Sequence, residues 1–494
     1  MKSLPLLLIS LLSLDIGGVA HSAPLISSRV GGLALIGPAS PHPASMYYNP
    51  AALGLVPGHR VYLTGGALLN LAGVERNATI PSSGAAATSR LPEEHSFTAA
   101  PHFYASLSSD FGTESVVLGL AFHTPSWAPS SFGDVGDGFI SPDEANTSRY
   151  HATDFLLKQY YVTVGAALHL GAGWYLGLSA SYVRGELDFA FVRDIAPYGG
   201  SVRDAGEVAA LDDCGDRPCG FESESAAEGL RISGVSHGLG FGGGLVGRIG
   251  PRILVGVGYI SHILGFGGDN IPSKGDVWLR RAEAAALPGE ERDLKGRSLV
   301  NYQLPDSLNI GLSWAATHIL DLNVQVRWML YHRHRKLDIE LSGSELRQAS
   351  ELPSRLLHNR GFQDTFALQG GLSYAITGQW RFSAAVMFES NAVPTDHLNA
   401  KAIDGWKADG FMSVAWQPLP RLQLRLGYGI VAMLPTEGGE AFNSQLLVDC
   451  VDSGYNIDVE ACRQAVDGLA LPNAKGRYWK ISQRMDLSIG YSWQ

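Results

Sequence analysis

The feature that most restricts how this chain can fold is a period-two alternation of apolar and polar residues that recurs along nearly its whole length. The C-terminal segment is the clearest case, because every second residue there is apolar: Met485, Leu487, Ile489, Tyr491 and Trp493. The residues between them are polar or glycine. Strict alternation over such a length predicts a β-strand with one apolar face.

About fourteen segments fit this description, with boundaries uncertain by several residues. We expect strands near 59–70, 95–107, 114–124, 156–169, 173–192, 228–248, 252–265, 299–315, 319–340, 363–377, 379–393, 405–417, 420–435 and 476–493. The connections after every second segment are short, as at Asp110–Gly112, Gly171–Ala172 and Gly250–Pro251. Most of the others run to roughly 20 to 40 residues, as the external loops of a membrane barrel do.

Connections sorted in this way are typical of a β-barrel in a bacterial outer membrane, which has short periplasmic turns, long external loops and an even number of strands. Such a sheet must close, because every backbone polar group needs a partner in lipid. We therefore predict an all-β fold, a transmembrane antiparallel β-barrel of about fourteen strands. An exported soluble all-β protein is the alternative.

The composition agrees with this prediction. Charged residues make up only 17% of the chain, against roughly 25% in soluble domains, and the 59 glycines disfavour helix interiors. A net charge of −10 argues against a nucleic-acid partner, which requires a basic surface. Tryptophans near the predicted strand ends suit interfacial girdles: Trp174, Trp314, Trp380, Trp416 and Trp493.

Residues 1–22 have the pattern of a secretory signal peptide. Lys2 precedes an apolar run from Leu4 to Leu14, which is shorter than the roughly 20 residues that a membrane-spanning helix needs. Small residues at Ala20 and Ser22 favour cleavage after Ser22, and cleavage after Ala20 is also open. We expect export of the mature chain without a helical anchor.

The four cysteines form two closely spaced pairs, Cys214 with Cys219 and Cys450 with Cys462. In an oxidising compartment we expect two disulfides, each stapling an external loop, although four cysteines allow three connectivities. A metal site is the alternative reading. Neither pair has CxxC spacing and no histidine lies close to either pair, so we predict neither a metal ion nor a cofactor.

Residues 23–57 precede the first strand and lack its alternation. Asn49 can cap a helix, Pro50 suits the first helical position, and Gly54 suits the stop, which predicts one compact helical turn that includes Ala51. A small-residue apolar segment of this length is poorly suited to exposure in water. We therefore place 23–57 inside the barrel (residues 58–494) as a hatch, with a loose N-terminal extension as the alternative.

Several segments of the chain resemble a known protein family. Ser28-Arg-Val-Gly-Gly32 followed by Tyr47-Tyr-Asn-Pro-Ala51 is similar to the N-terminal hatch of FadL-type outer-membrane transporters of long-chain fatty acids and other hydrophobic compounds. Leu304-Pro-Asp-Ser307, Phe362-Gln-Asp-Thr365 and Val393-Pro394 also resemble the family. In two places the chain departs from it: Pro41-His-Pro43 stands where acidic residues are usual, and Gln494 follows the aromatic Trp493.

The resemblance implies a fourteen-stranded barrel, a hatch in the lumen, passive uptake from the external loops into an apolar pocket, and lateral exit where a strand is kinked. It also implies basic residues for a carboxylate headgroup, and Arg184, Arg333 and Lys336 approximate those places. Arg333 and Lys336 have two alternative roles, in binding lipopolysaccharide phosphates or in pairing with nearby acidic residues.

Two enzymatic readings are weaker. Gly238-Leu-Gly-Phe-Gly-Gly243 matches GxGxxG, but strand-like sequence continues where a dinucleotide site needs a helix, so we read these glycines as a smooth inner wall. An outer-membrane lipase built from a wall serine and histidine lacks any motif that would place such a pair. We predict a monomeric, non-enzymatic importer of hydrophobic compounds, chiefly long-chain fatty acids, in contact with outer-membrane lipid and lipopolysaccharide. The alternative is a structural or surface-interaction barrel whose disulfide-stapled loops bind a partner.

Overall fold

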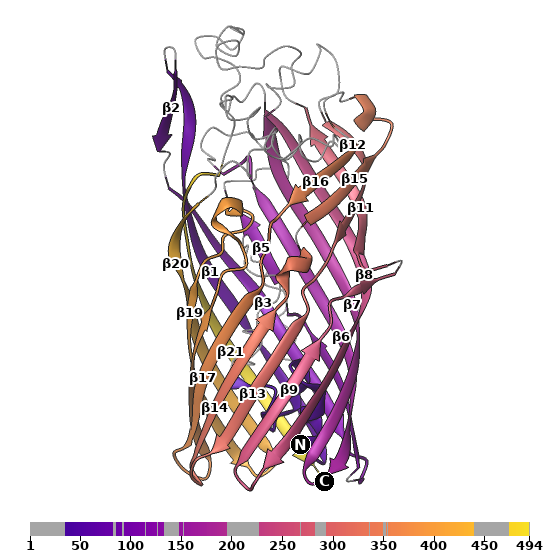
Figure 1. Ribbon diagram of the computed structural model, residues 1–494, viewed down its shortest axis with the longest axis vertical. Helices are drawn as coiled ribbons and strands as arrows, with labels where there is room; N and C mark the ends of the chain where they lie inside the picture. The colour runs from indigo at the N-terminus through magenta and orange to yellow at the C-terminus, as the bar shows by residue number, and fades with distance from the viewer. Residues whose placement is uncertain are drawn as a thin grey trace, which may run out of the picture.

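A computed structural model shows a closed antiparallel barrel of fourteen wall strands (Figure 1). It describes residues 35–493 except 83–84, 91–92, 114, 126, 133–147, 152, 195–226, 267, 282–292, 335, 349–351, 353 and 439–473. All four cysteines and the predicted signal peptide lie outside the described residues. Among the described residues, the helices are all too short or too polar to cross a membrane.

The wall strands follow one another around the barrel in chain order, and several consist of two or three segments. The segments are β1 (His59–Ser82) with its hairpin partner β2 (Ala85–Arg90), β3 (Glu94–Ser109), β4 (Val116–His123) with β5 (Trp127–Ser131), β6 (Asp154–Gly171), β7 (Trp174–Asp194), β8 (Ala227–Ile249), β9 (Ile253–Ile260) with β10 (Leu264–Gly265) and β11 (Ile271–Arg280), β12 (Asp293–Tyr302) with β13 (Ser307–Ala315), β14 (Leu320–Met329) with β15 (Lys336–Ser342), β16 (Arg355–Asn359) with β17 (Thr365–Ala375), β18 (Trp380–Glu389), β19 (Lys407–Leu419), β20 (Leu422–Gly438) and β21 (Gly476–Trp493). The first and last strands close the cylinder, pairing from His59 with Trp493 to Arg76 with Gly476.

The predicted short turns all lie at one end of the barrel, at the bottom of Figure 1. At the turn between β6 and β7, the three consecutive residues Gly171, Ala172 and Gly173 all have positive φ (95°, 52° and 76°). Glycine adopts this conformation without a steric penalty, which explains its use there. We call this end the short-turn end and the opposite one the long-loop end.

The outer surface carries an apolar belt. Along β18, Val386 and Phe388 are each 59% exposed, whereas Met387 between them is 5% exposed, as expected for strands with one face toward lipid. The predicted tryptophans Trp174, Trp314, Trp380, Trp416 and Trp493 lie near strand ends at the short-turn end. Trp380 stacks on Trp416, with ring centroids 5.7 Å apart.

Above the belt the outer face becomes charged. Opposite charges pair across neighbouring strands there, as in Arg231 with Asp188 on β8 and β7 (2.9 Å) and Arg355 with Asp338 on β16 and β15 (2.7 Å). Charged side chains on a lipid-facing surface are destabilising. These strand extensions therefore lie beyond the hydrocarbon.

The seventh to tenth wall strands are each interrupted, which the sequence reading did not foresee. The prediction of single strands over 299–315 and 319–340 was wrong in this respect: the first breaks between Tyr302 and Ser307, and the second at the short helix η8 (Tyr331–His334). Pro305 explains the first break, because proline has no N–H to donate to the ladder.

Asp306 holds three of these interrupted strands together. Its buried carboxylate accepts hydrogen bonds from the Tyr259 hydroxyl (2.6 Å) and the His262 backbone N–H (2.7 Å), contacts the His262 ring nitrogen Nδ1 (2.9 Å) and pairs with Arg333. Side-chain oxygens thus replace the lost backbone acceptors of the ladder.

Asp364 repeats this arrangement one strand pair further on. The backbone N–H of His332 donates to Asp364 at 3.1 Å, and the His332 ring nitrogen Nδ1 lies 2.7 Å from the same oxygen. Asp306 precedes β13 and Asp364 precedes β17, so each caps the end of the neighbouring strand.

Candidate functional site: the barrel lumen

The N-terminal segment 35–57 packs against the wall strands. It forms two short 3-10 helices, η2 (Pro43–Tyr47) and η3 (Pro50–Leu55), and η3 contacts β4, β6, β7, β8 and β9. The Asn49 side chain accepts from the Ala51 N–H at 3.0 Å, so the predicted cap is confirmed. Gly54 lies within η3 and is not its stop, because η3 continues to Leu55. The Tyr175 ring occupies the space where a Cβ of Gly54 would be.

Glycines in the wall make room for this segment. A Cβ on Gly177 would lie 2.0 Å from the Ala51 backbone nitrogen, and one on Gly258 would lie 2.1 Å from the Tyr48 carbonyl oxygen. Gly244, which directly follows the rejected GxGxxG stretch, faces Asn49 in the same way, and the Asn49 amide donates to the nearby Leu245 carbonyl at 3.1 Å. The predicted smooth inner wall is therefore present at Gly244. Closure of the lumen by residues 23–57 stays a prediction.

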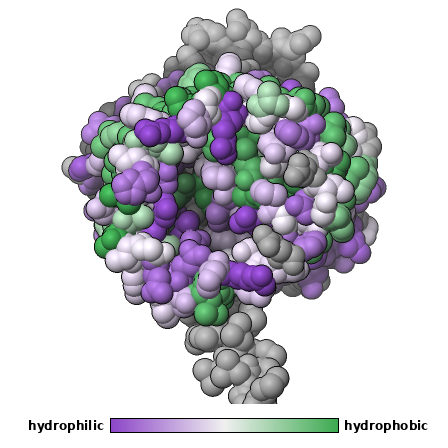
Figure 2. Space-filling model, turned by 90° about the horizontal axis from the view of Figure 1, so that it is seen from below, coloured by the Kyte–Doolittle hydropathy of each residue, from purple (hydrophilic) through white to green (hydrophobic). Residues whose placement is uncertain are grey.

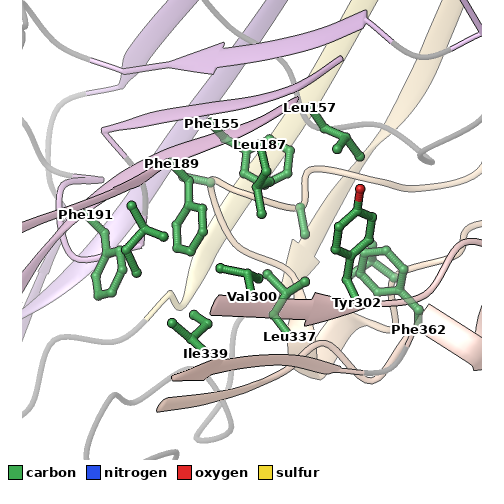
Figure 3. Close-up of a cluster of buried hydrophobic side chains, with 14 of the residues drawn as sticks. Phe155, Leu157, Leu187, Phe189, Phe191, Val300, Tyr302, Leu337, Ile339 and Phe362 are labelled. Atoms are coloured by element: carbon green, nitrogen blue, oxygen red, sulfur yellow. The ribbon is translucent and has the colours of Figure 1, made fainter. Parts of the chain in front are cut away.

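Toward the long-loop end, apolar side chains from facing walls converge inside the barrel (Figure 3). We call this group the upper apolar cluster. Its labelled members come from β6 and β7, from β12 and β15, and from the chain before β17: Phe155, Leu157, Leu187, Phe189, Phe191, Val300, Tyr302, Leu337, Ile339 and Phe362. Ala392, Val393, Leu398 and Ile403, between β18 and β19, join the same cluster.

Two cations border this cluster. The Arg360 guanidinium lies 5.4 Å from the Phe155 ring centroid and 5.5 Å from that of Phe362, and the Lys401 ammonium lies 4.1 Å from that of Phe191. Within the described part of the chain, neither side chain forms an ion pair with a carboxylate. The only polar side-chain contact of Arg360 there is with the ring of His334, at 2.8 Å.

The environment of Lys401 changes the pKa of its ammonium group. It lies in the connection between β18 and β19, outside the wall strands. Burial lowers the pKa of Lys401 to about 7, and the positive charge of Arg360 adds to the shift. An anion placed between the two cations would stabilise the charged form of Lys401.

A small pocket of about 60 Å³ continues the cluster toward the N-terminal segment. Tyr161, Ile263 and Met329 belong to the cluster and also line the pocket. Met46 and Tyr47 of the N-terminal segment line it as well. Ligand pockets commonly have 300–1,000 Å³, roughly, for a drug-sized molecule. A long-chain ligand therefore fits only if these side chains move.

The pocket also borders a break in the third wall strand. β3 pairs with β4 from Ser109–Leu118 to Tyr104–His123, and the Thr124 N–H donates to the Phe103 carbonyl at 3.0 Å. Beyond Thr124, the described residues of β3 and β5 form no ladder pairs. Tyr104, His123 and Pro125 line both the pocket and this break.

The opposite side of the lumen is polar. Its buried residues include Asn70, His102, Ser413 and Asp486. Asp486 contacts His102 and lies 3.2 Å from Arg484 Nε, and Arg484 stacks over Phe411 at 4.8 Å. The lumen thus has one apolar and one polar wall. Among the described residues, no group of His, Cys, Asp and Glu is arranged to hold a metal ion.

The three basic residues predicted from the resemblance are not brought together. Arg184 is on the outer face of β7, where it pairs with Glu186 at 2.8 Å, while its neighbour Val183 is buried. Arg333 forms an ion pair with Asp306, and Lys336 is exposed at the start of β15. A headgroup role for them stays a prediction that no contact in the described residues supports.

Comparison with known proteins identifies the group to which this architecture belongs. The family profile described as outer membrane protein transport protein (OMPP1/FadL/TodX) matches residues 20–432. The chain belongs to this family. Its FadL-type and TodX-type members are outer-membrane transport proteins for hydrophobic compounds and not enzymes, which confirms the predicted family, location and coarse function. Among curated proteins, none matches the chain by sequence.

Solved structures agree with the FadL-type fold. A Pseudomonas aeruginosa FadL homologue superposes with a TM-score of 0.69 at 13% identity, covering 97% of this chain and 100% of that one. The Ralstonia pickettii toluene transporter TbuX gives 0.59 at 14% identity, and the Pseudomonas putida toluene transporter TodX gives 0.62 at 12%; each covers 96% of this chain and 99% of its own.

Sequence reasoning missed Arg360 and Lys401, the two cations that border the upper apolar cluster. Arg360 immediately precedes Gly361 and the family-like Phe362-Gln-Asp-Thr365, and this proximity was the one local signal available. Lys401 lies in a connection without periodicity. Its position beside Phe191 depends on how that connection folds into the barrel.

Proposed function

We propose that this protein is a passive outer-membrane channel that takes up long-chain fatty acids in preference to neutral hydrocarbons. The observation that carries the proposal is the pair of cations, Arg360 and Lys401, bordering a buried apolar cluster without a carboxylate partner among the described residues. Burial of an unpaired charge is costly, and a bound carboxylate would offset that cost.

An alkyl chain would lie along the upper apolar cluster and the pocket below it. Each buried methylene contributes about 0.8 kcal/mol, so a long chain supplies most of the affinity and the headgroup supplies selectivity. We propose that the hatch, residues 23–57, closes the lumen and that the ligand leaves sideways through the break between β3 and β5. Displacement of Met46 and Tyr47 would enlarge the 60 Å³ pocket and open this route.

The double variant Arg360→Gln/Lys401→Gln is expected to lose fatty-acid binding. A hydrogen bond to a charged group contributes roughly 1.5–3 kcal/mol, so removing both should weaken laurate binding about 100-fold or more. Binding of 1-dodecanol, which has the same chain without the charge, should change little. Isothermal titration of the purified barrel measures both.

Arg297→Gln is the matched control, since this arginine is 77% exposed and pairs with Asp276 on the outer face. Uptake of labelled oleate by cells that lack other such transporters tests transport itself. Equal loss of laurate and dodecanol binding in the double variant would contradict the headgroup assignment. No uptake difference between cells with and without the protein would contradict the channel.

Affinity for a permanently ionised amphiphile such as dodecyl sulfonate is expected to depend on pH through Lys401. The free protein carries the Lys401 proton below pH 7 and loses it above. Binding above pH 7 therefore requires proton uptake, and affinity should fall up to about tenfold per pH unit until the higher pKa of the complex is reached. In Lys401→Met the profile should be flat between pH 6 and 9; a persisting slope would assign it to another group.

A further inference from the structure

A second cavity opens at the short-turn end, which is the periplasmic end in such barrels. It has a volume of about 710 Å³, within the range of small-molecule sites. Seen from this end, the molecule is hollowed at its centre, with hydrophilic residues around the hollow and hydrophobic ones at its depth (Figure 2). We call this cavity the vestibule.

The vestibule is strongly positive although the chain as a whole carries a net charge of −10. Among the described residues, six arginines and one carboxylate, Asp321, line it, so this lining has an excess of five positive charges. The arginines come from β1, from β8 and the turn after it, from β18, and from β20 and the turn before it: Arg60, Arg248, Arg252, Arg381, Arg421 and Arg425. A concave site lined by one sign of charge concentrates ions of the other sign.

Most of these arginines are not neutralised within the described residues. Arg381 pairs with Asp321 at 2.7 Å, and Arg60 donates to the Pro57 carbonyl at 3.2 Å. In that part of the chain, Arg248, Arg252, Arg421 and Arg425 have no carboxylate partner. The Nε of Arg425 is buried and lacks any hydrogen-bond acceptor there, which leaves a donor for a ligand oxygen.

The depth of the vestibule is apolar. Leu35, Ile36, Pro41 and Pro43 of the N-terminal segment line it, and Tyr62, Leu254 and Leu422 contribute from the wall. A lining that combines apolar side chains with cations fits a molecule with an alkyl chain and an anionic head. It fits neither a neutral hydrocarbon nor a small inorganic anion as well.

We propose that the vestibule is a binding site for a carboxylate amphiphile on the periplasmic side of the hatch, with the chain against Ile36 and Tyr62 and the head at the arginines of the lining, with Arg248 and Arg252 as the pair to be tested. The ligand class rests on the proposed function. The site lies apart from the upper apolar cluster and from the sideways exit, and it holds cargo that has already reached the periplasmic side.

Photo-crosslinking tests the site directly. A diazirine-bearing laurate is irradiated with the full-length protein in nanodiscs, and labelled peptides are mapped by mass spectrometry. Labels are expected on the segment around Ile36 and on β1 near Tyr62. Arg248→Gln/Arg252→Gln should reduce this labelling about tenfold or more, the loss expected for one charge-assisted hydrogen bond. Arg248→Lys/Arg252→Lys should retain most of it, and Arg477→Gln, an exposed arginine lining a different cavity, should retain all of it.

Three outcomes would overturn the proposal: labelling unchanged in the double glutamine variant, equal labelling by the matching dodecanol probe, or displacement of the probe by phosphatidylglycerol but not by laurate. The last result would assign the site to a lipid phosphate. The same measurement in Arg360→Gln/Lys401→Gln separates this proposal from the proposed function. Vestibule labelling should persist there even when binding at the upper apolar cluster is lost.

Discussion

On the proposal that residues 23–57 close the lumen, Gly177→Leu is expected to make the barrel leaky. A Cβ at this position would lie 2.0 Å from the Ala51 nitrogen and 2.4 Å from the Pro50 carbonyl carbon, both backbone atoms of η3. Backbone at the start of a capped helix cannot yield by a side-chain rotation, so the leucine must push the N-terminal segment away from β7. Purified variant in liposomes should then admit small sugars at rates that the unaltered protein does not reach.

Gly370→Leu is the matched control for this measurement. It makes the same substitution on another wall strand, β17, where a Cβ meets nothing within 4 Å. Sugar permeability should stay at the level of the unaltered protein. If Gly177→Leu forms a folded, heat-modifiable barrel that also stays closed, residues 35–57 are not the barrier and the proposed hatch fails.

Asp306→Ala is expected to lower the free energy of unfolding more than any other single substitution in the wall. The change removes the acceptor of Tyr259, of the His262 backbone N–H and of Arg333 in one step. Breaking a buried pair and leaving its partner uncompensated costs roughly 3–5 kcal/mol. The midpoint of denaturant-induced unfolding in detergent measures this loss.

Asp364→Ala tests whether the stability loss depends on burial of the carboxylate or only on the presence of a histidine–aspartate contact. Asp364 contacts His332 in the same geometry, but their side chains are 27% and 43% exposed, so the loss should be about 1 kcal/mol or less. Comparable losses in the two variants would mean that the stability lies in the cap and not in the buried charge.

The sequence predicted the barrel well because alternation is a local property. Lipid outside and a packed lumen inside impose period two on every strand, and the short turns need only two to six residues each. The interruptions of the seventh to tenth wall strands were harder to foresee, since Pro305 marks one of them but nothing local marks η8 or the detour after β9. After β9 and at η8, a backbone donor is satisfied by Asp306 and Asp364 from neighbouring strands, contacts that exist only once the sheet has formed.

The candidate site was predicted less well than the fold, for two different reasons. Arg184 was chosen from a loose resemblance, although the alternation of buried Val183 and Leu187 places residue 184 on the outer face. Arg360 and Lys401 lie in segments without a repeating pattern, at 360–364 and 390–406. Only the folded connection between β18 and β19 brings Lys401 to Phe191, so no reading of local periodicity could have paired them.

The four interrupted strands also divide the cylinder into two parts that can be exchanged separately. Below Asp306 and Asp364, continuous ladders fix the register of the base, whereas above them β11, β12, β15 and β16 form a ladder that is joined to the base by side-chain caps and by the pairing of β11 with the continuous strand β8. Chimeric channels assembled at these joints should therefore keep a relative's membrane base while carrying this protein's outer rim. The same joints give natural variation a place to change what is admitted without rebuilding the part that spans the bilayer.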